Sequence, residues 1–168
     1  MRKMIAIITC LTLLVSFSAC KSNDNIEVPA TFYYLATEIA YNNEQGVIAA
    51  EIRETCDISN DVVGILNRYL SGPSSENLQS PFPVETSIES LDYEEGAVIL
   101  QLSSAYATLS GIQLTLANAC LYKTVVALTN YETVCLQCTE ELDGDLSITL
   151  NADSLLLIDN THNTPTTD

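Results

Sequence analysis

Apolar and polar residues alternate in two early stretches, TFYYLAT at 31–37 and VIAAEIRET at 47–55, which is typical of half-buried strands. The turn-like segment AYNNEQG between them predicts that they pair as a hairpin. In SNDVVGILNRYLSGP the period lengthens to three or four residues, which predicts a helix with Ser59 or Asn60 as its N-cap and Gly72-Pro73 as its end. The expected buried face of this helix consists of Val62, Ile65, Leu66, Tyr69 and Leu70.

The second half of the chain repeats this order. VETSIESLDYE and GAVILQLSS read as strands joined at an acidic turn, and GIQLTLANACLYKTVVALTNY reads as a helix with a broad apolar stripe. ETVCLQCTEE and DLSITLNADSLLLID add two strands. We therefore expect an α+β fold, in which a mixed β-sheet of about five to six strands carries two helices packed on one face. The stripe of the second helix includes Leu114, Ala117, Leu121, Val125 and Leu128, widened by Ile112, Leu116 and Cys120.

The N-terminus has the features of an export signal. Two basic residues precede an apolar run at 4–17, which is too short to span a bilayer, and small residues follow it. The ending SFSAC resembles a bacterial lipobox, with Phe17 in place of the usual leucine, and predicts lipidation of Cys20. The alternative is an ordinary secretory signal with Cys20 as an incidental thiol. We expect a lipoprotein signal peptide at 1–19, a lipidated cysteine and flexible tether at 20–30, one domain at 31–159 and a polar tail at 160–168.

The charge of the chain restricts its partners. Removal of the signal leaves four basic residues against 22 acidic ones, a formal net charge of −18. The basic residues are scattered and cannot form a phosphate-binding face, so a nucleic-acid partner is not expected. The expected location is the outer face of the cell membrane, with membrane lipid held through Cys20.

Candidate catalytic groups are sparse. The single histidine, His162, lies in the polar tail, so a serine or cysteine nucleophile has no histidine partner within the domain. Acidic pairs lie at turns, where a solvated surface explains them, and ELDGDLS lacks the ligand spacing of a calcium-binding EF-hand. We therefore predict no enzyme activity and no cofactor.

Four cysteines besides Cys20 follow the signal. Cys135 and Cys138 are three residues apart in a predicted strand, so they point to opposite faces and are poorly placed to share a zinc ion. Cys120 in the second helix and Cys138 in the returning strand should lie level with each other, which predicts a disulfide or a close approach between them. Buried free thiols, including Cys56, are the alternative.

Three motifs in order resemble a known family. ILNRYLSGPSSENLQSPFP is similar to a helix ending in Leu-x-Gly-Pro followed by a Leu-x-Ser-Pro-x-Pro loop, and GAVILQLSSAY is similar to a Val-Asp-Leu-Ser strand end, with Gln101 in place of the aspartate. GIQLTLANACLYKTVVALTNYETV is similar to the helix that follows. These motifs characterise the GerMN domain of sporulation and spore-germination proteins, and the resemblance covers about residues 33–135. Its signature positions here are Leu70, Gly72, Pro73, Ser80, Pro81, Pro83, Leu102 and Ser103.

The resemblance implies a membrane-tethered, extracytoplasmic domain that acts by protein association and has no catalytic residues. The leading hypothesis is a scaffold or protein-interaction module for envelope or sporulation proteins, acting in sporulation, germination or cell-envelope assembly. The second hypothesis is a ligand-binding lipoprotein that recognises a cell-wall glycan or a small molecule through a groove. A flat face or a free strand edge would favour association, whereas a pocket with convergent polar groups would favour ligand binding.

Overall fold

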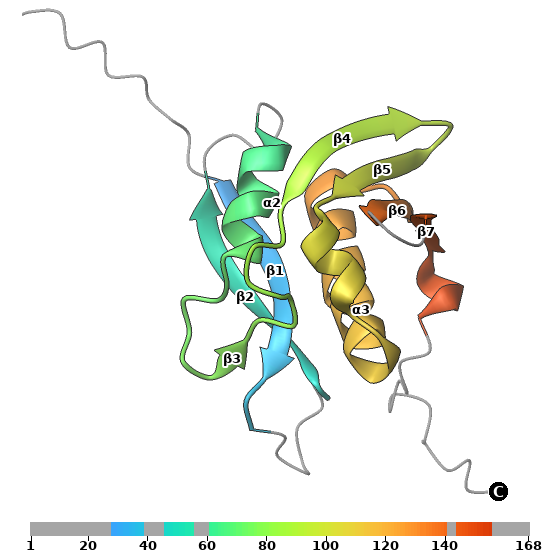
Figure 1. The fold of residues 1–168 in the computed structure, drawn as a ribbon. Coiled ribbons are helices and arrows are strands. Elements are labelled where there is room, and N and C mark those ends of the chain that lie inside the picture. The colour runs from blue at the N-terminus through green and yellow to red at the C-terminus, as the bar shows by residue number, and fades with distance from the viewer. Residues whose placement is uncertain (1–27, 39–45, 56–60, 141–143, 156–168) are drawn as a thin grey trace, which may run out of the picture.

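The computed structural model describes residues 28–38, 46–55, 61–140 and 144–155. The export signal, Cys20 with its lipidation, Cys56 and the polar tail lie outside these ranges, so their assignments stay predictions. The same is true of Ser59 and Asn60. The described residues form two β-sheets and two α-helices, with helix α3 lying between the sheets (Figure 1).

The smaller sheet has three strands in the order β2-β1-β3. Strands β1 (Val28–Ala36) and β2 (Ile48–Thr55) pair antiparallel along their full length, and β3 (Leu78–Gln79) adds a two-residue antiparallel pairing at the end of β1. The alternation seen in the sequence of β1 sets its two faces, because Ala30, Phe32 and Tyr34 are buried and the residues between them are more exposed.

The larger sheet has four strands in the order β4-β5-β6-β7, with bounds β4 (Ile88–Glu94), β5 (Ala97–Leu102), β6 (Thr133–Glu140) and β7 (Gly144–Leu150). Strands β5 and β6 are parallel, and the other neighbours are antiparallel. The turn between β4 and β5 has positive φ at both Glu95 and Gly96, which matches the right-handed twist of a tight hairpin. The register places Val98, Leu100 and Leu102 beside Val134, Leu136 and Cys138, all on the buried face.

Helix α2 (Val62–Leu70) begins at Asp61, whose side chain accepts a hydrogen bond from the Gly64 amide at 2.9 Å, and it ends directly before Ser71. Helix α3 (Gly111–Thr129) ends at Asn130, which is in the left-handed conformation. α3 is long and apolar enough to cross a bilayer, but it contacts both β1 and β6 as a core helix does. Short 3-10 helices, η1 (Ser104–Thr108) and η2 (Ala152–Ser154), precede α3 and follow β7.

Two helices close the open edge of strand β1. Because β3 pairs only with the end of β1, the backbone of Tyr33 has no strand neighbour on that side. The Tyr33 amide donates to the Thr124 hydroxyl in α3 at 3.0 Å, and the Tyr33 carbonyl accepts from the Tyr69 hydroxyl in α2 at 2.8 Å. A buried backbone group without a partner is costly, so these side chains replace the missing strand and join α2, α3 and β1.

The α+β class, the mixed pairing, the two helices and the order of elements are confirmed. The strands divide between two sheets, because α3 lies along the edge of β1 where the next strand of a single sheet would pair. Ile112 was expected in the apolar stripe of α3 but is 79% exposed, since the first turn of the helix extends past the core.

Candidate functional site

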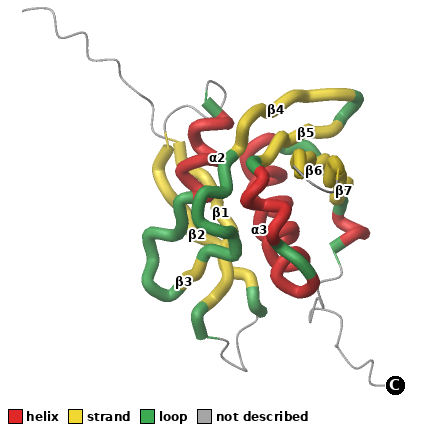
Figure 2. Tube along the Cα trace, viewed as in Figure 1, coloured by secondary structure: helices red, strands yellow, loops and turns green. Residues whose placement is uncertain are grey.

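The segment between α2 and β4, residues 71–87, is the candidate site and is called the crossover loop below. It contains five of the eight positions on which the GerMN resemblance rests and only two residues of strand, and it runs in an extended path past the smaller sheet (Figure 2). Such a loop would ordinarily be mobile, but its two ends are bound by side chains from three other elements.

Glu51 and Arg53 of β2 hold the beginning of the crossover loop. The Glu51 Oε1 atom accepts hydrogen bonds from the amides of Ser74 and Ser75 at 3.0 and 2.9 Å. Arg53 forms an ion pair with Glu51 and donates to the Gly72 carbonyl at 2.9 Å. Its guanidinium also lies over the Phe32 ring, 5.0 Å from the ring centroid. Charged groups in such bonds are held more firmly than neutral ones, so this pair fixes the direction in which the chain leaves α2.

Tyr34 of β1 also binds the beginning of the crossover loop, beside Arg53. Its single hydroxyl hydrogen is shared between the Tyr69 carbonyl at 2.7 Å and the Gly72 carbonyl at 3.1 Å, and its oxygen accepts from Arg53 at 2.7 Å. Burial raises the pKa of Tyr34 to about 12, against the opposing effect of the Arg53 charge. The hydroxyl therefore stays protonated and remains a hydrogen-bond donor over the physiological pH range.

Asn67 and Ser103 hold the end of the crossover loop. The Asn67 side chain accepts from the Ile88 amide at 2.8 Å and donates to the Ile88 carbonyl at 3.1 Å. The Ser103 hydroxyl donates to the Glu85 carbonyl at 3.1 Å and accepts from the Ser87 amide at 3.0 Å. Two side chains thus satisfy four backbone groups where the loop enters β4.

A tight turn at Pro83–Thr86 forms the most exposed part of the crossover loop. The Thr86 amide donates to the Pro83 carbonyl at 3.2 Å, and Glu85 has a φ of 77°, which together define a type II turn. Glycine is the usual residue at this position of the turn, so Glu85 is strained there. The turn displays Val84, whose side chain is 91% exposed. A single exposed apolar side chain is common on protein surfaces, but backbone strain is concentrated at functional sites, which makes this turn a candidate contact point.

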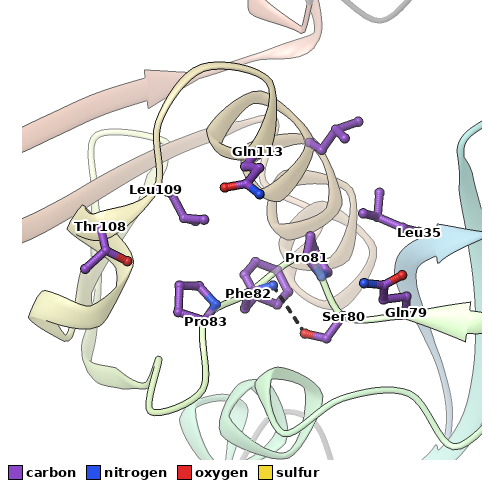
Figure 3. Close-up of a pocket in the computed structure, with 10 residues that line it drawn as sticks. Leu35, Gln79, Ser80, Pro81, Phe82, Pro83, Thr108, Leu109 and Gln113 are labelled. Atoms are coloured by element: carbon purple, nitrogen blue, oxygen red, sulfur yellow. Dashed lines mark hydrogen bonds between the residues drawn. The ribbon is translucent and has the colours of Figure 1, made fainter.

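Two open grooves lie on either side of the buried Phe82 ring. The first, the α3 groove, has a volume of about 330 Å³ and lies between the crossover loop and the start of α3 (Figure 3). Its lining is mainly apolar, with two amide and two hydroxyl side chains and no charged side chain. The lining residues are Leu35, Gln79, Ser80, Pro81, Phe82, Pro83, Thr108, Leu109, Gln113 and Leu116.

The second, the α2 groove, has a volume of about 510 Å³ and lies between the crossover loop and the end of α2. It shares Ser80, Phe82 and Pro83 with the α3 groove but is richer in hydroxyl groups. Because the two grooves share one wall, any ligand or partner in either of them contacts the crossover loop.

The signature residues gather at this loop and at the strand that ends beside it. Leu70 and Leu102 are buried in the core, and Gly72 has a φ of 113°, which an L side chain rarely adopts. Ser103 is the anchor described above. Motif comparison did not point to Glu51, Arg53 or Asn67 as anchors. The signal available was the i, i+2 spacing of Glu51 and Arg53, which places both on one face of a predicted strand.

The cysteines do not form the predicted bridge. Cys120 carries a free thiol buried in α3, so it is not joined to Cys138. The Cys138 Sγ atom instead donates to the Ser103 carbonyl at 3.1 Å. Burial is the main cause that raises the pKa of Tyr106, with smaller contributions from Cys120 and Cys138. The Cys138 thiol is thus directed at the end of β5 rather than at Cys120.

Strand alternation separates Cys138 from Cys135. Cys138 is buried, whereas Cys135 is half-buried on the opposite face, with its Sγ atom 3.6 Å from the Thr149 hydroxyl. Within the described ranges, no three side chains of histidine, cysteine, aspartate or glutamate gather where they could hold a metal ion.

These features define a small α+β domain with a rigidly held crossover loop. The first GerMN domain of the sporulation protein GerM from Bacillus subtilis is similar to it, with a TM-score of 0.53 and 15% identity over 75% of this chain and 98% of that chain. The tandem GerMN domains of the same protein give a TM-score of 0.51 and 19% identity over 67% of this chain and 39% of the tandem chain. No family model matches the sequence, and no curated protein does. The chain has a GerMN-like fold.

Proposed function

We propose that this chain is a lipid-anchored, extracytoplasmic, non-catalytic domain that binds partner proteins through its crossover loop. The observation that carries the proposal is the combination of rigidity and exposure in one segment. Glu51 and Ser103 fix the two ends of the loop, while Val84 and the α3 groove lie open beside it. A preorganised apolar surface loses little conformational entropy on binding, which favours association.

The chemistry of the α3 groove supports association over catalysis. Proline, leucine and glutamine side chains provide apolar contacts and amide hydrogen bonds, but none of them transfers a proton near neutral pH. The groove is also uncharged in a protein with a large negative charge. A partner with an apolar, uncharged segment therefore meets less electrostatic repulsion here than at the acidic β4–β5 hairpin.

The biological role of this chain and the class of its partner are inferred from the fold. The similar solved domains belong to a sporulation protein, and the predicted export signal and Cys20 would tether this domain outside the cytoplasm. We propose a scaffold role in sporulation, germination or cell-envelope assembly, with an envelope or sporulation protein as partner.

Site-specific photo-crosslinking tests this proposal. A photoreactive phenylalanine analogue replaces Val84 in the full-length chain, and in a control it replaces Ile52, which is 72% exposed and apolar but lies on the smaller sheet away from the loop. We expect one envelope or sporulation protein to be captured at Val84 and absent at Ile52, and we expect Val84→Asp to abolish its co-purification with the chain. Equal capture at both positions, or none at Val84, would show that the loop is not the association surface.

The anchor is tested separately. Mass spectrometry of the chain from the membrane fraction should show a mature N-terminus at Cys20 carrying a lipid. An unmodified Cys20, or a mature chain that begins elsewhere, would contradict lipidation without affecting the crosslinking result.

A further inference from the structure

The α2 groove contains a buried hydroxyl that the fold leaves unused. Thr86 is only 8% exposed, and its Oγ1 atom has no hydrogen-bond partner among the described residues. An unsatisfied buried hydroxyl lowers stability, and native proteins contain few of them. Replacing the hydroxyl by a methyl group would remove this cost at almost unchanged volume, so the hydroxyl is not there for stability.

The backbone on both sides of Thr86 is fixed. Ser103 binds the Glu85 carbonyl and the Ser87 amide, and the Thr86 amide itself closes the turn to Pro83. The residue therefore cannot leave the groove wall to find a partner. The Oγ1 atom is itself buried, so a ligand in the groove reaches it only after a rotation of about 120° around χ1, which carries the hydroxyl to the position now held by the methyl group or by the β-hydrogen.

The lining of the α2 groove indicates the class of ligand. Ser71, Ser80 and Ser87 add hydroxyls to that of Thr86, and Glu85 is the single charged residue. No basic side chain is present in the lining, so a phosphate or another acid would be repelled rather than bound. Leu70, Phe82, Pro83 and Val84 supply apolar surface between the hydroxyls.

A neutral saccharide fits this combination better than a peptide does. A sugar presents hydroxyl groups at its edge and C–H groups on its face, which matches a groove of hydroxyls set in apolar walls. An extended peptide would need the edge of a strand for its backbone, whereas the groove is lined by a helix end and by the loop before β4. The volume of about 510 Å³ is within the range of about 300–1,000 Å³ that ligand sites occupy.

We propose that the α2 groove binds a neutral saccharide, with Thr86 Oγ1 bonded to one of its hydroxyls. The site adjoins the proposed protein-association surface, because Val84 and the wall of Ser80, Phe82 and Pro83 belong to the α2 groove as well, but it is argued from the hydroxyls of the α2 groove alone. The sugar can be a free oligosaccharide or the end of a polymer, since both present the same groups.

The test uses the full-length chain in a micelle of a detergent without a sugar headgroup. Binding of N,N′-diacetylchitobiose and of maltose is measured by calorimetry, and co-sedimentation with particulate chitin distinguishes a polymer end from a free saccharide. Thr86→Val is compared with Thr108→Val, a matched control whose hydroxyl donates to the Ala105 carbonyl beside the α3 groove. Thermal melting is recorded for each variant.

We expect at least one of the two disaccharides to bind the wild-type chain. Thr86→Val should weaken that binding at least fivefold and raise the melting temperature. Thr108→Val should leave the affinity unchanged. Because the key variant should be more stable than the wild type, loss of binding cannot be attributed to unfolding. Absence of binding to both disaccharides and to chitin would overturn the proposal. Undiminished binding by Thr86→Val, or an equal loss in Thr108→Val, would overturn it as well. None of these results depends on whether a protein is captured at Val84.

Discussion

Arg53 is the residue whose removal should affect the crossover loop most. Its side chain is 20% exposed and that of its partner Glu51 is 11% exposed, so the ion pair is largely removed from water. Arg53→Ala would leave the Glu51 carboxylate without its counter-charge and the Gly72 carbonyl with the longer bond from the Tyr34 hydroxyl alone. It would also remove the guanidinium from the faces of Phe32 and Tyr34.

The expected loss follows from these contacts. Breaking a buried ion pair by removing one partner costs about 3–5 kcal/mol. The residual exposure and the second set of donors to Glu51, the amides of Ser74 and Ser75, favour the lower end. We therefore expect Arg53→Ala to lower the free energy of unfolding by about 3 kcal/mol, which for a domain of this size is about 10 °C in melting temperature.

Urea denaturation and amide hydrogen exchange measure the effect. The exchange rates of the Ser74 and Ser75 amides should rise more than those of the helix α3 core, since the loop is released first. Arg68→Ala is the matched control, because Arg68 is exposed on α2 and its loss should change stability by less than about 0.5 kcal/mol. A change below about 1 kcal/mol for Arg53→Ala, or exchange that rises equally everywhere, would refute the anchoring role of the pair.

Three further predictions concern strain, thiols and pH. Glu85→Gly should raise the free energy of unfolding by up to about 1 kcal/mol, because glycine adopts positive φ without strain. Asn130→Gly should raise it less, because asparagine tolerates the left-handed conformation. A lower free energy of unfolding for Glu85→Gly in urea denaturation would show that Glu85 is not strained. Cys120 is buried and Cys135 is half-buried, so peptide mapping after thiol labelling should find Cys135 modified first, and equal labelling would disprove the burial. Burial raises the pKa of both Cys120 and Tyr34 to about 12, so above pH 9 the folded state holds these protons more tightly than the unfolded state. The contribution of these two groups to stability should be constant below pH 8, and stability should fall by more than about 2 kcal/mol between pH 8 and pH 11, less steeply in Cys120→Ala. Stability that rises with pH over this interval in thermal melts would contradict the assignment.

The order and type of the elements followed from local periodicity. Alternation over residues 31–37 and 47–55, and the longer period of 62–70 and 111–129, predicted the strands and helices close to their observed bounds. Gly72-Pro73 marked the end of α2 correctly. These signals are readable because each depends on residues within one or two turns of each other.

The partition into two sheets could not be read in this way. It depends on whether the edge of β1 meets a strand or a helix, and the deciding contacts join Tyr33 to Thr124 and to Tyr69 across long sequence separations. The failed Cys120–Cys138 bridge has the same origin. Spacing along the helix and the strand could predict only approximate positions for the two cysteines, whereas the direction of the Cys138 sulfur toward the Ser103 carbonyl depends on tertiary packing.

For the candidate site too, some features followed from the sequence and others only from the tertiary structure. The sequence by itself determined that residues 71–87 leave a helix at Gly72-Pro73 and contain prolines that reduce the freedom of the unfolded chain. Only the tertiary structure decided that Glu51, Arg53, Asn67 and Ser103 hold this loop and that Thr86 keeps an unused hydroxyl beside a groove. The physical reason is that periodicity and turn propensity are local properties of the chain, whereas hydrogen bonds between distant elements exist only once those elements are packed together.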